Sequence, residues 1–215
     1  MPIAEHTIAR YRKSLRRAVR RVSVCVVVAA GVLLAGISWR AQAQQPKASE
    51  FQVKAAYLYN FGRFVEWPDR PDRPDRPERN APASSDPFEI CVLGADPFGP
   101  TLDATLARET IAGKSVAAKR ISRPQDIDDC RILFISSSEQ DHLKEVLMAL
   151  DKASVLTVSD IPRFSERGGM IGFILDGDRV RFDVNLASAQ DARLTLSSEL
   201  LKVAMNVRKD RPGDF

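Results

Sequence analysis

Short apolar runs that alternate with helix-like segments are the feature that most constrains this chain. Phe88–Leu93, Arg131–Ile135 and Val155–Val158 are predicted to be buried strands, because each is a compact run of apolar and β-branched residues. Helix-like segments follow the first two, at Pro100–Arg108 and from the Ser136–Ser138 cap to Leu150. Strands that alternate with helices are typical of α/β domains with parallel pairing.

The pattern changes in the last third of the chain. Met170–Leu175 and Arg179–Val184 are two apolar runs joined through Asp176-Gly177-Asp178, and Asp-Gly between such runs predicts a β-hairpin. Ser197 or Ser198 is expected to cap a final helix, with its inward face formed by Leu200, Leu201, Ala204 and Val207. We therefore expect an α/β fold: one mixed β-sheet flanked by helices, with a C-terminal hairpin and final helix.

The segment from Val53 to Pro68 predicts an amphipathic helix that docks across this sheet. Ser49 and Gln52 fit a capping box at its start, and Glu50 precedes Lys54 in the favourable order for a helical ion pair. Pro68 cannot continue the helix. Helical spacing predicts one broad apolar face, made of Val53, Ala56, Tyr57, Phe61, Phe64 and Val65.

Five aromatic residues fall within this helix and its end, namely Tyr57, Tyr59, Phe61, Phe64 and Trp67. One amphipathic helix does not need so many, although most of them are explained by packing in the core. Tyr59 and Trp67 are the best candidates for a surface role in binding a partner. The alternative, that both belong to the core, stays open at this stage.

Residues 1–43 resemble a cleavable signal peptide. Seven basic residues between Arg10 and Arg21 precede an uncharged run from Val22 to Ile37, and Ala41-Gln42-Ala43 fits a cleavage signal. The run is short for a membrane span, which needs about 20 apolar residues. We expect an exported, periplasmic protein, with an uncleaved membrane anchor as the alternative.

Removing residues 1–43 reverses the sign of the net charge. The whole chain has 32 basic and 28 acidic residues. The segment takes eight basic residues and one acidic residue, which leaves 24 basic against 27 acidic residues in the predicted mature chain. A net negative chain of this kind argues against a nucleic-acid partner.

The predicted mature chain is long enough for one domain, which we place at residues 44–207. Within it, residues 68–87 contain a Pro-Asp-Arg repeat with proline at every third position. Proline at that density excludes a helix or central strand, so we expect a solvated surface loop, with a partner-binding arm as the alternative. Residues 208–215 are expected to form a polar tail.

Two cysteines, Cys91 and Cys130, remain after Cys25 leaves with the predicted signal. An even number of cysteines in an oxidising compartment favours a disulfide. Both border strand-like runs that could be neighbours in one sheet. Two buried free thiols are the alternative.

The sequence offers little catalytic chemistry. The mature chain has a single histidine, His142, and no metal-binding or nucleophile motif, so we expect no catalytic residues, metal or cofactor. Arg179 and Arg181 lie two apart on one predicted strand and hence on one face, where they could bind an anionic ligand, although solvated strand charges explain them more simply. The residues thus favour an exported binding or regulatory domain over an enzyme.

The chain resembles the YfiR family of periplasmic regulators from about Phe51 to Val207. Seven blocks in order carry the resemblance: V-K-A-A-Y-L-Y-N-F-G-R-F-V-E-W-P (53–68), C-V-L-G-A-D-P-F-G (91–99), C-R-I-L-F-I-S-S-S (130–138), V-L-T-V-S-D (155–160), G-G-M-I-G-F (168–173), R-F-D-V-N-L (181–186) and S-S-E-L-L-K-V-A (197–204).

The resemblance implies a non-enzymatic repressor. Such a protein binds the periplasmic sensor domain of an inner-membrane diguanylate cyclase and holds it inactive, which lowers cyclic-di-GMP and biofilm formation. An outer-membrane lipoprotein can sequester the repressor. The resemblance also implies homodimers and redox-sensitive cysteines, which Cys91 and Cys130 match by position.

The chain departs from the family pattern in two places. Some relatives carry a second cysteine pair near the Gly-Gly loop, whereas residues 165–172 contain none here. The Pro-Asp-Arg repeat also looks like an expansion of a shorter connector. The competing interpretation is a periplasmic small-ligand sensor that works with a histidine kinase or transporter.

Overall fold

A computed structural model of the chain describes residues 48–68, 86–151 and 153–209. The described residues fall in one compact unit that starts at Ala48. The predicted signal peptide at 1–43, nearly all of the Pro-Asp-Arg repeat and the last six residues lie outside them. Among the described residues, no helix has both the length and the apolar character needed to cross a membrane.

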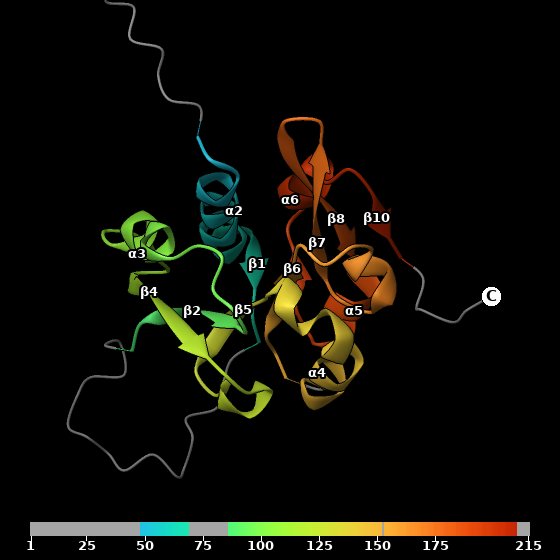
Figure 1. Ribbon diagram of the computed structural model, residues 1–215, viewed down its shortest axis with the longest axis horizontal. Helices are drawn as coiled ribbons and strands as arrows, with labels where there is room; N and C mark the ends of the chain where they lie inside the picture. Colours follow the sequence, from blue (N-terminus) through green and yellow to red (C-terminus); the bar gives the residue numbers. More distant parts are fainter. Residues whose placement is uncertain (1–47, 69–85, 152, 210–215) are drawn as a thin grey trace, which may run out of the picture. The chain divides into compact units, whose positions relative to one another are not determined.

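The predicted mixed α/β architecture is confirmed (Figure 1). The α-helices are α2 (Glu50–Phe64), α3 (Pro100–Leu106), α4 (Leu143–Ala149), α5 (Leu186–Asp191) and α6 (Ser198–Val203). The strands are β1 (Val65–Glu66), β2 (Phe88–Leu93), β3 (Thr110–Ile111), β4 (Lys114–Ile121), β5 (Cys130–Ile135), β6 (Leu156–Ser159), β7 (Ile171–Asp176), β8 (Arg179–Asn185), β9 (Thr195–Leu196) and β10 (Val207–Arg208). Three 3₁₀ helices are η1 (Pro124–Asp126), η2 (Ser137–His142) and η3 (Phe164–Arg167).

Eight strands form the main sheet, in the order β10-β8-β7-β6-β5-β2-β4-β3. The central strands β4, β2, β5, β6 and β7 pair in parallel, as the alternating pattern predicts. The predicted hairpin is present, because β7 and β8 pair antiparallel with Asp176 opposite Arg179. Gly177 in the connecting turn has φ of 58°, a conformation that glycine adopts without steric cost.

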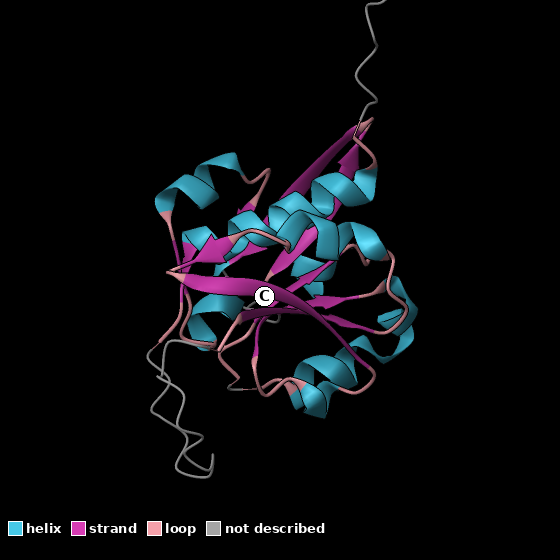
Figure 2. Cartoon of the chain, turned by 90° about the vertical axis from the view of Figure 1, so that its left-hand side faces the viewer, coloured by secondary structure: helices cyan, strands magenta, loops and turns pink. Residues whose placement is uncertain are grey.

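Helices cover both faces of this sheet and create two hydrophobic cores (Figure 2). Alternate residues of one strand point to opposite faces, so Ile90 and Val92 enter one core while Cys91 and Leu93 enter the other. The first core lies under α2, α3, α5 and α6, and we call it the aromatic core after its buried rings, Phe61, Phe88, Phe98, Phe134, Phe173 and Phe182.

The second core lies under α4 and η3 and contains both mature cysteines, so we call it the disulfide core. Its buried members are Cys91, Leu93, Ile121, Cys130, Leu133, Ile135, Leu143, Val146, Leu150, Val155, Ile161 and Phe164. Three of them come from α4 and its C-cap residue: Leu143, Val146 and Leu150. The helix itself is shorter than predicted, because Ser136 caps the 3₁₀ helix η2 and α4 begins only at Leu143.

Helix α2 begins with the predicted capping box, in which the Ser49 hydroxyl accepts from the Gln52 amide and the Gln52 side chain accepts from the Ser49 amide. The predicted apolar face is confirmed in part: Phe61 and Val65 are buried, and Val53 and Tyr57 pack half-buried against the core, but the centre of the buried face is rotated about the helix axis. The buried positions are Lys54, Ala55, Leu58, Phe61 and Gly62, whereas Phe64 is exposed. Gly62 explains the shift, because a Cβ there would lie 2.5 Å from Ile111 Cδ1.

The C-terminal region differs from the prediction in two respects. The helix α5, which was not predicted, follows Asn185, whose side chain caps its start. The final helix ends at Val203, and Val207 lies beyond it in β10 together with Arg208, a residue predicted to belong to the polar tail. Val207 still packs against the aromatic core, as predicted. β10 pairs in parallel with β8.

Candidate functional site

Cys91 and Cys130 form a disulfide between the neighbouring strands β2 and β5, with their Cα atoms 5.7 Å apart. Both side chains are fully buried. A β-bulge makes the bond geometrically feasible: Glu89 pairs with Cys130, but the next residue, Ile90, pairs with Ile132. The extra residue turns Cys130 away from the face that Ile132 occupies and toward Cys91.

A carboxylate lies beside this disulfide. Glu89 precedes Cys91 by two residues on β2, and one of its oxygens lies within 4.8 Å of both sulfur atoms. Its Oε2 atom is buried and makes no hydrogen bond to any described residue. Lys119 on β4 places its Nζ 3.4 Å from Oε2. With the two sulfurs bonded to each other, these three residues do not form a metal site in this oxidised state.

Trp67 lies half-buried just beyond β1. Its indole N–H donates a hydrogen bond of 3.2 Å to the Arg131 carbonyl, and its ring packs edge-on against Phe88 with centroids 5.3 Å apart. These contacts tie the end of α2 to the sheet. They give Trp67 a structural role, and its part in binding a partner stays a prediction.

Tyr59 lies on the side of α2 that faces β3. Its hydroxyl donates to the Thr110 carbonyl at 3.4 Å, and the Arg63 guanidinium lies 5.9 Å from its ring centroid. The neighbouring Glu109 carboxylate raises the pKa of Tyr59, because it offers the phenol proton an alternative acceptor and disfavours the phenolate. The ring is half-buried, and its role in partner binding also stays a prediction.

Arg179 and Arg181 share one face of β8, as predicted, and this face is opposite to the aromatic core. Arg179 is exposed and pairs in register with Asp176, while half-buried Arg181 pairs with Ile174. An acidic residue opposite Arg179 reduces the attraction of this face for an anion. Anion binding here stays a prediction.

The sequence did not reveal a buried ion pair under the start of α2. Lys54 is 2% exposed, and its Nζ lies 2.7 Å from Asp160 Oδ2 at the end of β6. The predicted pair with Glu50 is also present, and the ammonium lies 4.9 Å from the Phe51 ring centroid. The cluster fixes α2 over the carboxyl ends of the parallel strands. It could not be predicted from the sequence, because Lys54 and Asp160 are far apart along the chain.

Three exposed apolar side chains lie on the hairpin and around the end of α6. Leu175, Val203 and Met205 are 55%, 59% and 48% exposed, and they are three of the five large apolar side chains found exposed among the described residues. Leu175 on β7 is adjacent to Val180 on β8, and the Met205 amide donates to the Phe182 carbonyl. The three residues, which we call the hairpin patch, thus come from segments that flank β8.

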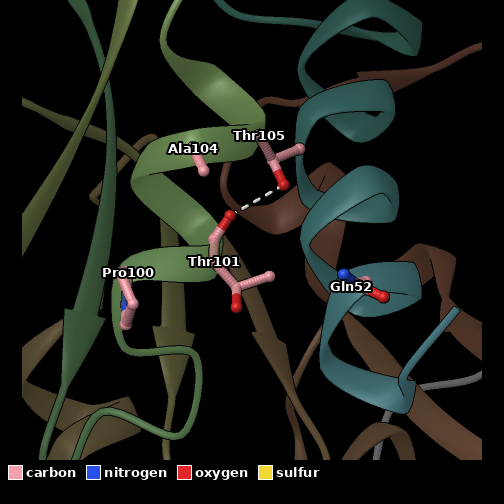
Figure 3. Close-up of a pocket in the computed structure, with 5 residues that line it drawn as sticks. All are labelled: Gln52, Pro100, Thr101, Ala104 and Thr105. Atoms are coloured by element: carbon pink, nitrogen blue, oxygen red, sulfur yellow. Dashed lines mark hydrogen bonds between the residues drawn. The ribbon is translucent and has the colours of Figure 1, made fainter.

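A shallow groove of about 360 Å³ lies between α2 and α3 (Figure 3). It is lined by Gln52, Pro100, Thr101, Ala104 and Thr105, and the Thr105 hydroxyl donates to the Thr101 carbonyl at 2.8 Å. None of these five side chains titrates near neutral pH. The groove can hold a small neutral molecule but offers no acid, base or nucleophile activated by a base.

Comparison with known proteins identifies one family. A family model described as YfiR/HmsC-like matches residues 51–205, which include all the elements from α2 to α6. The chain is also similar to the crystal structure of a conserved domain protein from Vibrio cholerae O1 biovar El Tor strain N16961, with 11% identity and a TM-score of 0.44. That match covers 56% of this chain and 54% of the other, so the chain spans about half the length of that structure.

Proposed function

Because the chain belongs to the YfiR/HmsC-like family, we propose that it is a periplasmic, non-enzymatic repressor of an inner-membrane diguanylate cyclase. In this proposal it binds the periplasmic sensor domain of the cyclase and holds the enzyme inactive, which lowers cyclic-di-GMP and biofilm formation. The family match over residues 51–205 carries the proposal. The buried disulfide supports the periplasm, because disulfides persist in oxidising compartments.

The distribution of exposed apolar side chains supports binding to another protein. A stable interface needs apolar anchors that lose their water on binding. The hairpin patch supplies three such side chains on segments that flank β8. Tyr59 and Trp67 are less available, because each already makes intramolecular contacts. We therefore place the main contact at the hairpin patch and keep Tyr59 and Trp67 as secondary anchors.

The assembly around this repressor is also part of the proposal. An outer-membrane lipoprotein would compete with the cyclase for the repressor and so release the enzyme. The repressor itself would act as a homodimer. Both features follow from the resemblance of the chain to YfiR-like regulators.

Binding to the purified periplasmic domain of the cyclase tests the proposal directly. We expect Leu175→Ser and Val203→Ser each to raise the dissociation constant by at least about fivefold, which corresponds to a loss of about 1 kcal/mol of binding free energy. Met148→Ser is the matched control, because Met148 is 58% exposed on α4, away from the aromatic core. Tyr59→Ala and Trp67→Ala are expected to weaken binding less than the two patch variants.

Cells provide the second arm of this experiment. Deleting the gene should raise cyclic-di-GMP, and the wild-type gene should restore the lower level. Unchanged cyclic-di-GMP together with no binding to the cyclase domain would contradict the proposal. It would favour a small-ligand sensor that acts with a histidine kinase or transporter, for which the groove between α2 and α3 is the observed candidate pocket.

A further inference from the structure

The structure holds a three-residue donor set whose members come from two adjacent strands. Glu89 and Cys91 lie two residues apart on β2, so their side chains share one face, and the bulge on β5 turns Cys130 toward the same face. One carboxylate oxygen and the two sulfurs all lie within 4.8 Å of one another. Paired strands hold these three side chains, which makes the set more rigid than ligands on a loop.

We propose that reduction of the Cys91–Cys130 disulfide converts this cluster into a binding site for Zn²⁺ or a similar thiophilic divalent cation. Two thiolates and one carboxylate are suitable ligands for zinc, and three protein ligands leave one position for water in a tetrahedral site. With Zn–S bonds of about 2.3 Å, two sulfurs on one tetrahedral zinc lie about 3.8 Å apart. The sulfurs of Cys91 and Cys130 reach that separation by small side-chain rotations once their bond is broken.

The surroundings of Glu89 provide an independent reason for the proposal. The buried Oε2 atom makes no hydrogen bond to any described residue, and the Lys119 ammonium is 3.4 Å away. A buried carboxylate oxygen with no hydrogen bond is costly, and a metal ion would satisfy it. The side chains of Glu89 and Lys119 are 19% and 37% exposed, so the carboxylate side of the cluster is the entry path from solvent.

The chemistry balances with a small dithiol as the reductant. The dithiol gives two electrons and two protons to the sulfur–sulfur bond, which breaks into two thiols, while the dithiol closes into a cyclic disulfide. Binding of Zn²⁺ then displaces both thiol protons to water as two Zn–S bonds form. The bound metal prevents the two sulfurs from rejoining, so the reduced state persists until the metal is removed.

Metal titration of the reduced protein tests the proposal. The purified chain is reduced with a dithiol under anaerobic conditions, freed of reductant, and checked for folding by circular dichroism. Added Co²⁺, the spectroscopic probe, should bind one ion per chain and give a sulfur-to-cobalt charge-transfer band in the near ultraviolet, which Zn²⁺ abolishes. The oxidised protein should give no such band.

Substitutions distinguish the proposed site from thiols that bind metal without it. Glu89→Gln should weaken Zn²⁺ binding by at least about tenfold in competition with a chelating dye, whereas Glu145→Gln, an exposed carboxylate on α4, should leave it unchanged. Lys119→Gln should strengthen binding, because it removes a cation from the site. A folded, reduced protein without the band, or equal affinity of the wild type and Glu89→Gln, would overturn the proposal.

Discussion

On one face of the sheet, rings from α2 and the strands pack against one another in stacked and edge-to-face pairs, while on the other face a covalent bond joins β2 to β5. In the aromatic core, Phe61 lies 5.1 Å from Phe182 and 5.9 Å from Phe173, measured between ring centroids. The disulfide core instead combines aliphatic side chains with the Cys91–Cys130 bond. It lies under one α-helix of seven residues and short 3₁₀ segments, so the bond compensates for thinner cover.

The difference shows that the stability of the two faces responds to different conditions. Ring packing depends on burial of apolar surface and is insensitive to redox state. The disulfide stabilises chiefly by restricting the unfolded chain, and a reductant can remove it. Variants on each face should therefore separate the two contributions.

The largest effect is expected from Phe61→Ala in the aromatic core. Phe61 is 1% exposed and contacts rings from α2, β7 and β8. Its truncation should lower the free energy of unfolding by about 3–5 kcal/mol, through lost burial and the cavity left behind. Urea denaturation followed by fluorescence measures the change. A loss below about 1 kcal/mol would mean that the core repacks around the missing ring.

A slightly smaller effect is expected when both cysteines are replaced by alanine. The bond closes a separation of 39 residues, for which the chain-entropy model gives about 3–4 kcal/mol. A reductant should lower the wild-type denaturation midpoint to about that of the variant and leave the variant itself unchanged. If the reductant has the same effect on both proteins, the bond does not account for the stability of this face.

The smallest effect is expected at Arg120, which holds α3 at the rim of the aromatic core. Its guanidinium donates to Asp96, to Asp103 and to the Gly99 carbonyl. Arg120 lowers the pKa of Asp103 by hydrogen bonding to the carboxylate. More than half of the Asp103 side chain is exposed, so solvent screens the ion pair. Arg120→Gln should therefore lower the free energy of unfolding by only about 0.5–1 kcal/mol at neutral pH.

The pH dependence of this loss has a definite sign. Because the folded-state pKa of Asp103 is depressed, its contribution is present above the unfolded value of about 3.9 and disappears as the pH falls through the folded value. The wild type and Arg120→Gln should therefore differ in stability at pH 7 and converge in strong acid. Denaturation curves at several pH values check this, and a constant difference would exclude the Asp103 contact as its source.

Much of the fold was predictable because its signals are local. The capping box at Ser49, the Asp-Gly turn and the buried runs of β2 and β5 each lie within a few residues, and all are present. The rotation of α2 was mispredicted because Gly62, which an apolar pattern does not mark, is buried at a point where a Cβ would clash with Ile111. The pair of Lys54 with Glu50 was predicted, but its second partner was missed because Asp160 lies more than one hundred residues away.

The candidate sites show the same limit. The sequence supported the pairing of Cys91 with Cys130, because predicted export leaves two cysteines and both border strand-like runs that could be neighbours. It gave no sign that Glu89 lies beside the sulfurs, since that requires both the strand register and the bulge at Cys130. The hairpin patch was also missed, because it joins Leu175 on β7 to Val203 on α6 and Met205 just beyond that helix, which are distant in sequence.

The pairing of β1 with β9 has a consequence for the order in which the fold closes. Val65 pairs with Leu196, and the Ser197 amide donates to the Phe64 carbonyl, so the end of α2 is held by residues near the other end of the chain. Contacts of such long sequence separation form late and slow folding. A growing chain thus cannot make this contact at the end of α2 until most of the described residues have been synthesised. We expect a chain that stops at Leu194 to leave α2 open to protease digestion, which limited proteolysis would detect.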